Sequence, residues 1–161
     1  MRAGSGSRRA ARKPAPVCEH RMKRRVQFHE TDAAGLVHFT AFFRYLEEAE
    51  HELWRAAGLS IHPPGTEVGF PRLATSFEFH QPMRFEDEFE VRIRVVEMKK
   101  STLRYVCAIS RGRERIATGS LTIVCVRKQP RRPLKAISIP PDIAARFRAA
   151  PEPHFTKEPR Q

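Results

Sequence analysis

The chain has 161 residues, which suits a single domain with a sizeable core. Hydrophobic residues make up 40% of the chain, and no apolar run approaches the roughly 20 residues that a membrane-spanning helix needs. We therefore expect a soluble protein with no membrane partner. Cys18, Cys107 and Cys125 are far apart and lack metal-ligand spacing, which predicts reduced structural thiols, no bound metal and a cytoplasmic location.

The formal net charge of +12 is concentrated in the two flanks of the chain. Residues 26–126 hold twelve basic and fourteen acidic residues, whereas 1–25 and 127–161 hold nine basic residues each. Such flanks can adhere to nucleic acid, but no base-reading motif is present, so nucleic acid is not the expected partner. Residues 1–20 are predicted to be a disordered basic leader, and residues 141–161 a loosely ordered tail. The leader also has the composition of an organellar transit peptide, and that alternative stays open.

A strand and then a long helix are predicted after the leader. Alternating apolar residues over 21–28 predict the strand. From Thr40 the apolar residues recur at three- and four-residue steps, which predicts one amphipathic helix. Thr40 is its expected N-cap, and Gly58 its expected C-terminal stop.

Four strand patterns follow the helix. Their apolar residues lie at 73–79, 89–95, 103–109 and 121–126. The last pattern is nearly all apolar, which is typical of a strand buried on both faces. The breaks between the strands are short and polar, so neighbouring strands are predicted to be antiparallel hairpin partners. Together these elements predict an α+β fold in which the helix packs on one face of an antiparallel sheet.

A candidate catalytic residue lies between the first strand and the helix. Asp32 is followed by the small residues 33–35 and comes directly before the helix. A helix N-terminus presents unpaired N–H groups and a partial positive charge, which suits a developing oxyanion. A carboxylate nearby can act as general base or nucleophile toward a carbonyl that those amides polarise. An Asp in this place is also an ordinary cap or turn residue, and spacing alone does not separate the two roles.

The stretch 28–37, FHETDAAGLV, with the helix that follows it, resembles the signature of the 4-hydroxybenzoyl-CoA thioesterase family of hot-dog proteins. The resemblance covers residues 21–140, the predicted domain. It implies a curved antiparallel sheet wrapped around one long central helix, and an acyl-CoA thioesterase that needs no separate cofactor. Asp32 would then be the nucleophile or general base, and the backbone N–H of Phe39 would polarise the thioester carbonyl. The family also implies a homodimer or homotetramer with active sites at the dimer interface.

The resemblance adds candidates with less defined roles. His38 stands where many relatives carry an aromatic residue, so it is a candidate to line the acyl pocket, to assist proton transfer or simply to pack. Thr75 and Ser76 are candidates to donate hydrogen bonds into the site of a partner copy. Glu30 is interpreted as an exposed turn residue, and Glu47 and Glu48 as solvated or interface residues.

The phosphates of coenzyme A require cations near the mouth of a site. Lys99 and Lys100, at a predicted hairpin tip, and Arg104 just after it are the first candidates. A second basic cluster at residues 111–115 holds three arginines. Charged hairpin tips are also often only solvated, and this interpretation stays open for both clusters.

Two other functions stay open beside thioester hydrolysis. A hot-dog hydratase or dehydratase needs a His with an acidic partner, for which His38 and Glu47 are a poor pair. A non-catalytic hot-dog module would bind acyl-CoA, or RNA through the basic flanks, without turnover. The sequence does not identify the acyl group.

Overall fold

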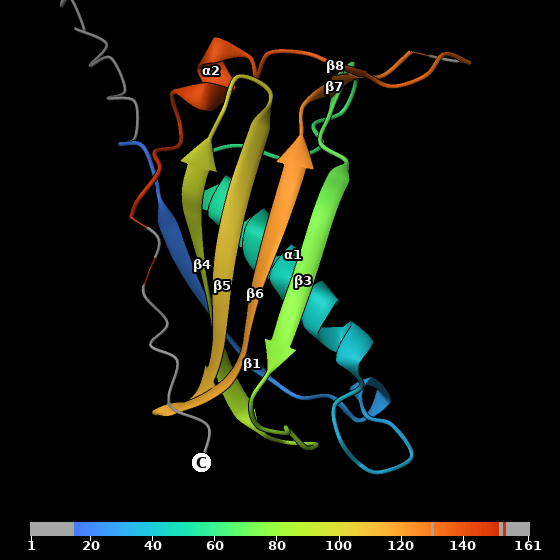
Figure 1. The fold of residues 1–161 in the computed structure, drawn as a ribbon, viewed down its shortest axis with the longest axis vertical. Coiled ribbons are helices and arrows are strands. Elements are labelled where there is room, and N and C mark those ends of the chain that lie inside the picture. The colour runs from blue at the N-terminus through green and yellow to red at the C-terminus, as the bar shows by residue number, and fades with distance from the viewer. Residues whose placement is uncertain (1–14, 130, 152, 154–161) are drawn as a thin grey trace, which may run out of the picture.

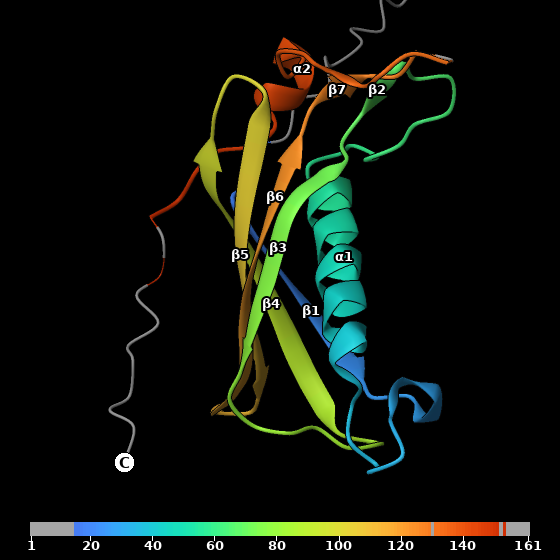
Figure 2. The same ribbon diagram turned by 45° about the vertical axis from the view of Figure 1, so that its right-hand side comes forward.

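The computed structural model describes residues 15–129, 131–151 and 153 of the chain, so most of the predicted leader (1–14) lies outside the described residues. A five-stranded antiparallel sheet, in the order β1-β4-β5-β6-β3, carries one long helix, α1, on one face (Figures 1 and 2). A three-stranded sheet, β2-β7-β8, extends from one end (Figure 1). This arrangement confirms the predicted α+β class. The bounds are β1 Glu19–Arg25, a 3-10 turn at Phe28–Glu30, α1 Phe39–Ala56, β2 Val68–Gly69, β3 Arg72–Phe79, β4 Glu88–Met98, β5 Thr102–Arg111, β6 Glu114–Val124, β7 Val126–Arg127, β8 Lys135–Ala136 and α2 Pro141–Ala144.

Helix α1 begins two residues earlier than expected. His38, not Thr40, is its N-cap, and the His38 side chain accepts a hydrogen bond from the Thr40 N–H. Val37 is held extended by its N–H···O bond to Met83 (2.8 Å), so the helix can start only after it. At the other end Gly58 has a φ of 73°, which confirms the predicted stop. No helix in the described part of the chain is long and apolar enough to cross a membrane.

The first strand ends earlier than the apolar alternation predicts. β1 stops at Arg25, and a 3-10 turn at Phe28–Glu30 follows, in which Gln27 and Glu30 cap one another. Phe28 is consequently 76% exposed, although its place in the pattern predicted a buried side chain. Val26 still bonds to the segment before β4, its N–H to the Asp87 carbonyl at 3.0 Å, whereas the bonds between Gln27 and Glu30 satisfy Gln27 within the turn.

The strand pairing differs from the predicted chain of hairpins. β4–β5 and β5–β6 pair as neighbours, but β3 pairs with β6 and β4 pairs with β1. The loop over 80–87 therefore joins strands that are not adjacent, and β3 lies at one edge of the sheet. β6 is also longer than the apolar run 121–126: it starts at Glu114, and beyond Val124 the chain enters the small sheet.

The core lies between α1 and the sheet. On β4 the apolar residues alternate as predicted, and Val91, Ile93 and Val95 are all fully buried. Burying a side chain of this size stabilises a fold by about 1.5–3 kcal/mol. Trp54 on α1 packs on the ring of Phe147, which is itself buried, so the packed structure continues past the domain end expected at residue 140.

Candidate active site

Asp32 lies in a tight turn directly before α1. Its Oδ1 atom accepts hydrogen bonds from the N–H groups of Ala34 (2.8 Å) and Leu36 (3.1 Å). Gly35 has a φ of +72°, a conformation that is unfavourable for residues with a Cβ atom. The Asp32 side chain is exposed, and its Oδ2 atom has no hydrogen-bond partner within the described part of the chain. Asp32 thus shapes the turn and still presents one free carboxylate oxygen.

The same turn is folded back onto the start of α1. The Asp32 N–H donates to the Leu36 carbonyl (2.8 Å), and the His38 N–H donates to the Glu30 carbonyl (2.8 Å). Phe39 is the first residue of the helix, and its N–H donates to no acceptor among the described residues. An unpaired N–H at the positive end of an 18-residue helix is suited to binding a carbonyl oxygen that gains negative charge. The structure therefore brings the two predicted catalytic groups to one end of the molecule.

His38 has a defined structural role. Its Nδ1 atom lies 2.7 Å from the Thr40 hydroxyl and 3.4 Å from the Thr40 nitrogen, so it caps the helix. Its ring packs on the Phe39 ring at a centroid distance of 4.6 Å. Proton transfer by His38 stays a prediction.

Glu30 was expected to be an exposed turn residue, and this expectation is wrong. Its side chain is only 9% exposed and accepts hydrogen bonds from Tyr45 Oη, Arg24 Nη1 and the Gln27 N–H, each at 2.8 Å. Burial alone would raise the pKa of Glu30, but these three donors outweigh it and lower the pKa. Arg24 also pairs with Glu48 (3.1 Å), so Glu48 is not merely solvated. This network anchors the Asp32 turn on α1.

Only part of this network could have been found in the sequence. A Glu three residues after Gln27 fits a capping pattern, and the structure contains that pair. The contact with Tyr45 joins the turn to a helix residue fifteen positions further along the chain, and no local pattern indicates it.

Aromatic side chains surround this end of the molecule. Phe28 (76% exposed) meets Phe85 (47% exposed) edge to face at 5.7 Å. On the helix side, Phe42 contacts Phe79 at 4.9 Å, and Phe79 is also half exposed. Large apolar side chains are rarely left exposed together without a partner or ligand. They form a surface suited to an apolar or aromatic group.

Arg84 is a cation that the sequence did not single out. Leu36 forms a β-bridge with Arg84, and Arg84 Nη1 lies 3.8 Å from the position that a Cβ atom on Gly35 would take. Its guanidinium group is therefore beside the Asp32 turn. The two segments are far apart in sequence, so only the folded chain reveals this.

Thr75 and Ser76 lie on the edge strand β3 and are exposed. Thr75 Oγ1 donates to the Ser120 carbonyl (3.1 Å), and the Ser76 hydroxyl lies 2.9 Å from the Ser120 hydroxyl. Both hydroxyls thus contact β6, and neither contacts Asp32 of the same chain.

Lys99 and Lys100 lie at the opposite end of the sheet from Asp32. β4 has 11 residues, which at about 3.3 Å per residue separates its ends by roughly 35 Å. Lys99 pairs with Glu97 (3.1 Å). Arg104 lies between two residues buried beneath α1, so its side chain is on the other face of the sheet. Within one chain, these three candidates cannot serve the Asp32 turn.

The second basic cluster is at the Asp32 end, but its first member is already paired. Arg111 binds both Glu114 (2.6 Å) and Asp87. Asp87 in turn accepts a hydrogen bond from the Arg84 N–H (2.9 Å), which places Arg111 near the loop beside the Asp32 turn.

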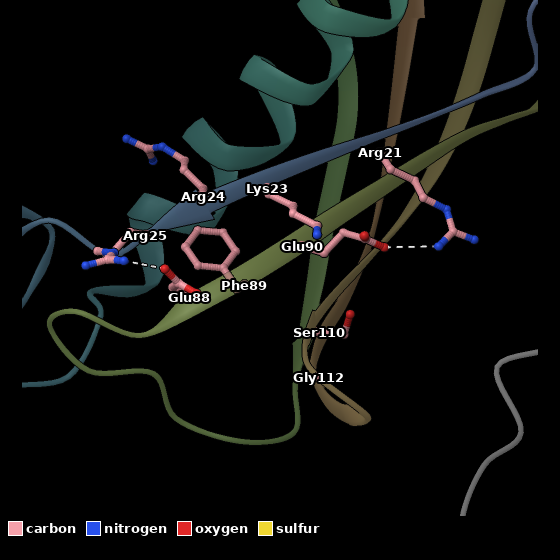
Figure 3. Close-up of a pocket in the computed structure, with 9 residues that line it drawn as sticks. All are labelled: Arg21, Lys23, Arg24, Arg25, Glu88, Phe89, Glu90, Ser110 and Gly112. Atoms are coloured by element: carbon pink, nitrogen blue, oxygen red, sulfur yellow. Dashed lines mark hydrogen bonds and ion pairs between the residues drawn. The ribbon is translucent and has the colours of Figure 1, made fainter.

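A hollow of about 750 Å³ lies beside β1, β4 and the β5–β6 turn (Figure 3). No residue of the Asp32 turn lines it. Arg21 pairs with Glu90 across it (3.3 Å), and Arg25 pairs with Glu88. The hollow is a paired, charged surface and does not complete the candidate active site.

A sheet wrapped around one helix, with a carboxylate turn before that helix, defines the hot-dog thioesterase class. The family model described as the Thioesterase-like superfamily matches residues 26–147. The chain belongs to this superfamily, and it is a thioester hydrolase of hot-dog fold.

Individual relatives support this placement. A protein of Aquifex aeolicus that bears the provisional name esterase is 33% identical over 124 residues, which cover 75% of this chain and 91% of the relative. The structure is similar to the 1,4-dihydroxy-2-naphthoyl-CoA thioesterase of Synechocystis, with a TM-score of 0.74, 20% identity, and coverage of 80% of this chain and 95% of that one. It is also similar to the 4-hydroxybenzoyl-CoA thioesterase of Pseudomonas sp. strain CBS-3, with a TM-score of 0.70, 20% identity, and coverage of 80% and 98%. At these identities, the two structures show the shared fold.

Proposed function

We propose that the chain hydrolyses an acyl-CoA thioester with Asp32 as nucleophile or general base. The observation that carries this proposal is a free carboxylate oxygen on a turn that is folded against the unpaired N–H of Phe39. The N–H would bind the thioester carbonyl oxygen while Asp32 attacks the carbonyl carbon or takes a proton from an attacking water. The C–S bond then breaks, and the coenzyme A sulfur takes up a proton and leaves as the thiol. With Asp32 as general base the water oxygen becomes part of the released acid directly. With Asp32 as nucleophile, water must then hydrolyse the acyl–Asp32 anhydride to release the acid and restore the carboxylate. Coenzyme A is part of the substrate, and no separate cofactor is needed.

The acyl group that fits best is aromatic. Phe28, Phe85 and Phe79 leave large parts of their rings exposed around the Asp32 end. Aromatic rings pair favourably in edge-to-face or offset geometry, which adds to the burial of apolar surface. Two of the similar structures are named for aryl-CoA substrates, which agrees with this surface.

We propose a homodimer that pairs through β3 as the smallest active unit, and a homotetramer would contain two of them. β3 pairs only with β6 among the described strands, so its other edge offers free N–H and C=O groups. Leu73 is 61% exposed and Phe79 51% exposed on this strand, which a second copy would cover. Thr75 and Ser76 would then lie at the interface, where they can reach the partner's site.

The dimer also gives a role to the distant lysines. When β3 pairs antiparallel with its own copy, the two molecules run in opposite directions. The end with Lys99 and Lys100 in one copy then lies on the same side as the Asp32 end of the other. There, with Arg104 nearby, the lysines would bind the phosphates of coenzyme A. The free thiols of Cys18, Cys107 and Cys125 support a reducing compartment such as the cytoplasm.

Thiol release from a panel of aryl- and alkyl-CoA esters tests the reaction, with Asp32→Asn as the matched inactive control. We expect release with the wild-type protein, fastest for aryl esters, and almost none with the variant. Binding without thiol release would favour a non-catalytic acyl-CoA module. Conversion of the acyl chain with the thioester intact would favour a hydratase or dehydratase.

A further inference from the structure

Helix α1 buries one carboxylate that the proposed reaction does not use. Glu50 is 0% exposed. Among the residues that the structure describes, it is the one charged residue that is buried. Its Oε2 atom accepts a hydrogen bond from Arg72 Nη2 at 2.7 Å, whereas Oε1 has no partner among residues 15–129, 131–151 and 153. An ionised carboxylate in a core is unfavourable unless it is paired, so Arg72 is the group that makes Glu50 tolerable there.

The groups that face this pair come from α1 and β5. On α1, Glu47 also binds Arg72 Nη2 (3.0 Å), and His51 interacts electrostatically with both Glu47 and Arg72. On β5, the Tyr105 hydroxyl accepts a hydrogen bond from Trp54 Nε1 (3.1 Å), and its pKa is raised by burial and further by Glu50. Glu47 is half exposed, so it is a second, solvated partner of the same arginine.

Arg72 is the first residue of the edge strand β3. The register of β3 on β6 shifts directly after it, between Arg72 and Ala74. Arg72 Nη1 also contacts the Phe70 carbonyl (3.5 Å), on the segment that leads into the strand. The Glu50–Arg72 pair therefore ties β3 to α1 at the irregularity where the strand begins. Since an edge strand has a hydrogen-bonded neighbour on one side alone, such a tie helps to set its register and twist.

We propose that Glu50 is a positioning residue: through Arg72 it holds the start of β3 against α1, and so keeps the free edge of β3 in the conformation that pairs with a second copy of the chain. Glu50 has this role only if the chain dimerises through β3, as proposed above. The exposed Leu73 follows Arg72 directly, so the Glu50–Arg72 ion pair lies next to the surface that a second copy would cover.

This role makes dimerisation sensitive to pH. Burial raises the pKa of Glu50 to about 7. Arg72 opposes this shift, because its positive charge stabilises the carboxylate, and the negative charge of Glu47 adds a smaller increase. Above this pH the carboxylate attracts Arg72, and below it the neutral acid no longer does so. The dimer should therefore weaken as pH falls through about 7.

Sedimentation at about pH 8.5 and about pH 5.5 measures the dimer dissociation constant for the wild type, Glu50→Gln and the control Glu47→Gln. The control removes the exposed partner of the same arginine. At the higher pH we expect Glu50→Gln to raise the constant at least about tenfold, and Glu47→Gln to change it less than about threefold. At the lower pH the wild type and Glu50→Gln should agree within about threefold, because Glu50 is then protonated. Other titrating groups, such as interface histidines, affect both proteins and cancel in the ratio.

If Glu50→Gln does not fold, the double change Glu50→Met with Arg72→Met replaces the pair by apolar side chains, an exchange that folds commonly tolerate. It should fold, weaken the dimer at about pH 8.5, and agree with the wild type within about threefold at about pH 5.5, where the wild-type pair is already lost. A dimeric wild type whose dissociation constant is unaffected by either variant would overturn this role and leave the dimer standing. A monomeric wild type would overturn both the role of Glu50 and the proposed dimer. The assay of thiol release tests the proposed hydrolysis separately.

Discussion

The first turn of α1 and its later turns present opposite environments. At the first turn, the Phe39 N–H and one oxygen of Asp32 are left without partners, and the rings nearby are exposed. Along the later turns, Glu50 and Trp54 are fully buried and hydrogen-bonded to Arg72 and Tyr105. One helix thus carries groups free for chemistry at its start and groups paired for packing in its second half.

The difference separates activity from stability along one element. A change at the first turn should alter turnover and leave the free energy of unfolding almost unchanged. A change in the later turns should lower the free energy of unfolding without touching the reacting groups. Unpaired polar groups at a functional site are available to a substrate, whereas unpaired polar groups in a core only destabilise it.

The largest expected effect is that of Asp32→Asn. It should lower kcat about 10²–10⁴-fold, because the amide is neither a base nor a nucleophile. Asn retains the oxygen that accepts the Ala34 and Leu36 N–H bonds, so the melting temperature should stay close to that of the wild type. Thiol release and thermal unfolding measure the two quantities. A variant with kcat within a few-fold of wild type would remove Asp32 from the proposed mechanism.

Arg72→Met should have the largest effect on stability. It leaves Glu50 buried without its partner, which costs about 2–3 kcal/mol near pH 8, since Arg72 is partly exposed and screened. The pKa of Glu50 in the folded chain is raised from its ordinary 4.5 to about 7, so its ionisation lowers stability as pH rises through that window.

Without Arg72 the pKa of Glu50 rises further, so the decrease in the free energy of unfolding caused by Arg72→Met should grow with pH. Near pH 5 the Glu50 carboxyl is already protonated in the wild type, so Arg72→Met should lower the free energy of unfolding much less than it does near pH 8. Urea unfolding at both pH values and one protein concentration measures this. An equal loss at both would show that Arg72 contributes by packing and not by charge.

A matched pair of tyrosine changes tests the boundary between the two regions. Tyr45→Phe and Tyr105→Phe each remove one buried hydroxyl and should each cost about 1–2 kcal/mol of stability. Tyr45 also holds Glu30 beneath the Asp32 turn, so Tyr45→Phe should lower kcat several-fold, whereas Tyr105→Phe should not. Equal kcat values for both would mean that the Glu30 network does not position the turn.

The smallest expected effect is that of changing Lys99 and Lys100 together to Ala. The phosphates of coenzyme A are far from the breaking bond, so KM should rise a few-fold at low salt while kcat stays unchanged. At high salt the difference should shrink, because the wild-type attraction is already screened. A thioester lacking the nucleotide is the control and should not distinguish the proteins. An unchanged KM would make Arg84 and the cluster at residues 111–115 the next candidates.

The sequence by itself determined the features that depend on neighbouring residues. Three- and four-residue periodicity located α1, and Gly58 marked its end because its positive φ suits glycine. Alternation located the buried face of β4, and the motif around Asp32 indicated the hot-dog class that the fold and family confirm. These signals are local, so they can be read without knowing which segments meet.

Tertiary structure alone decided which segments meet. β3 pairs with β6 and not with the next strand, Glu30 binds Tyr45, and Glu50 binds Arg72 22 positions further along the chain. It also placed Lys99 at the end of the sheet opposite Asp32, which no spacing in the sequence reveals. The physical reason is that pairing and burial are set by the combined free energy of contacts between distant segments. Glu47 and Glu50 are both glutamates of one helix that bind Arg72, yet Glu47 is half exposed and Glu50 is fully buried, and the sequence does not distinguish them.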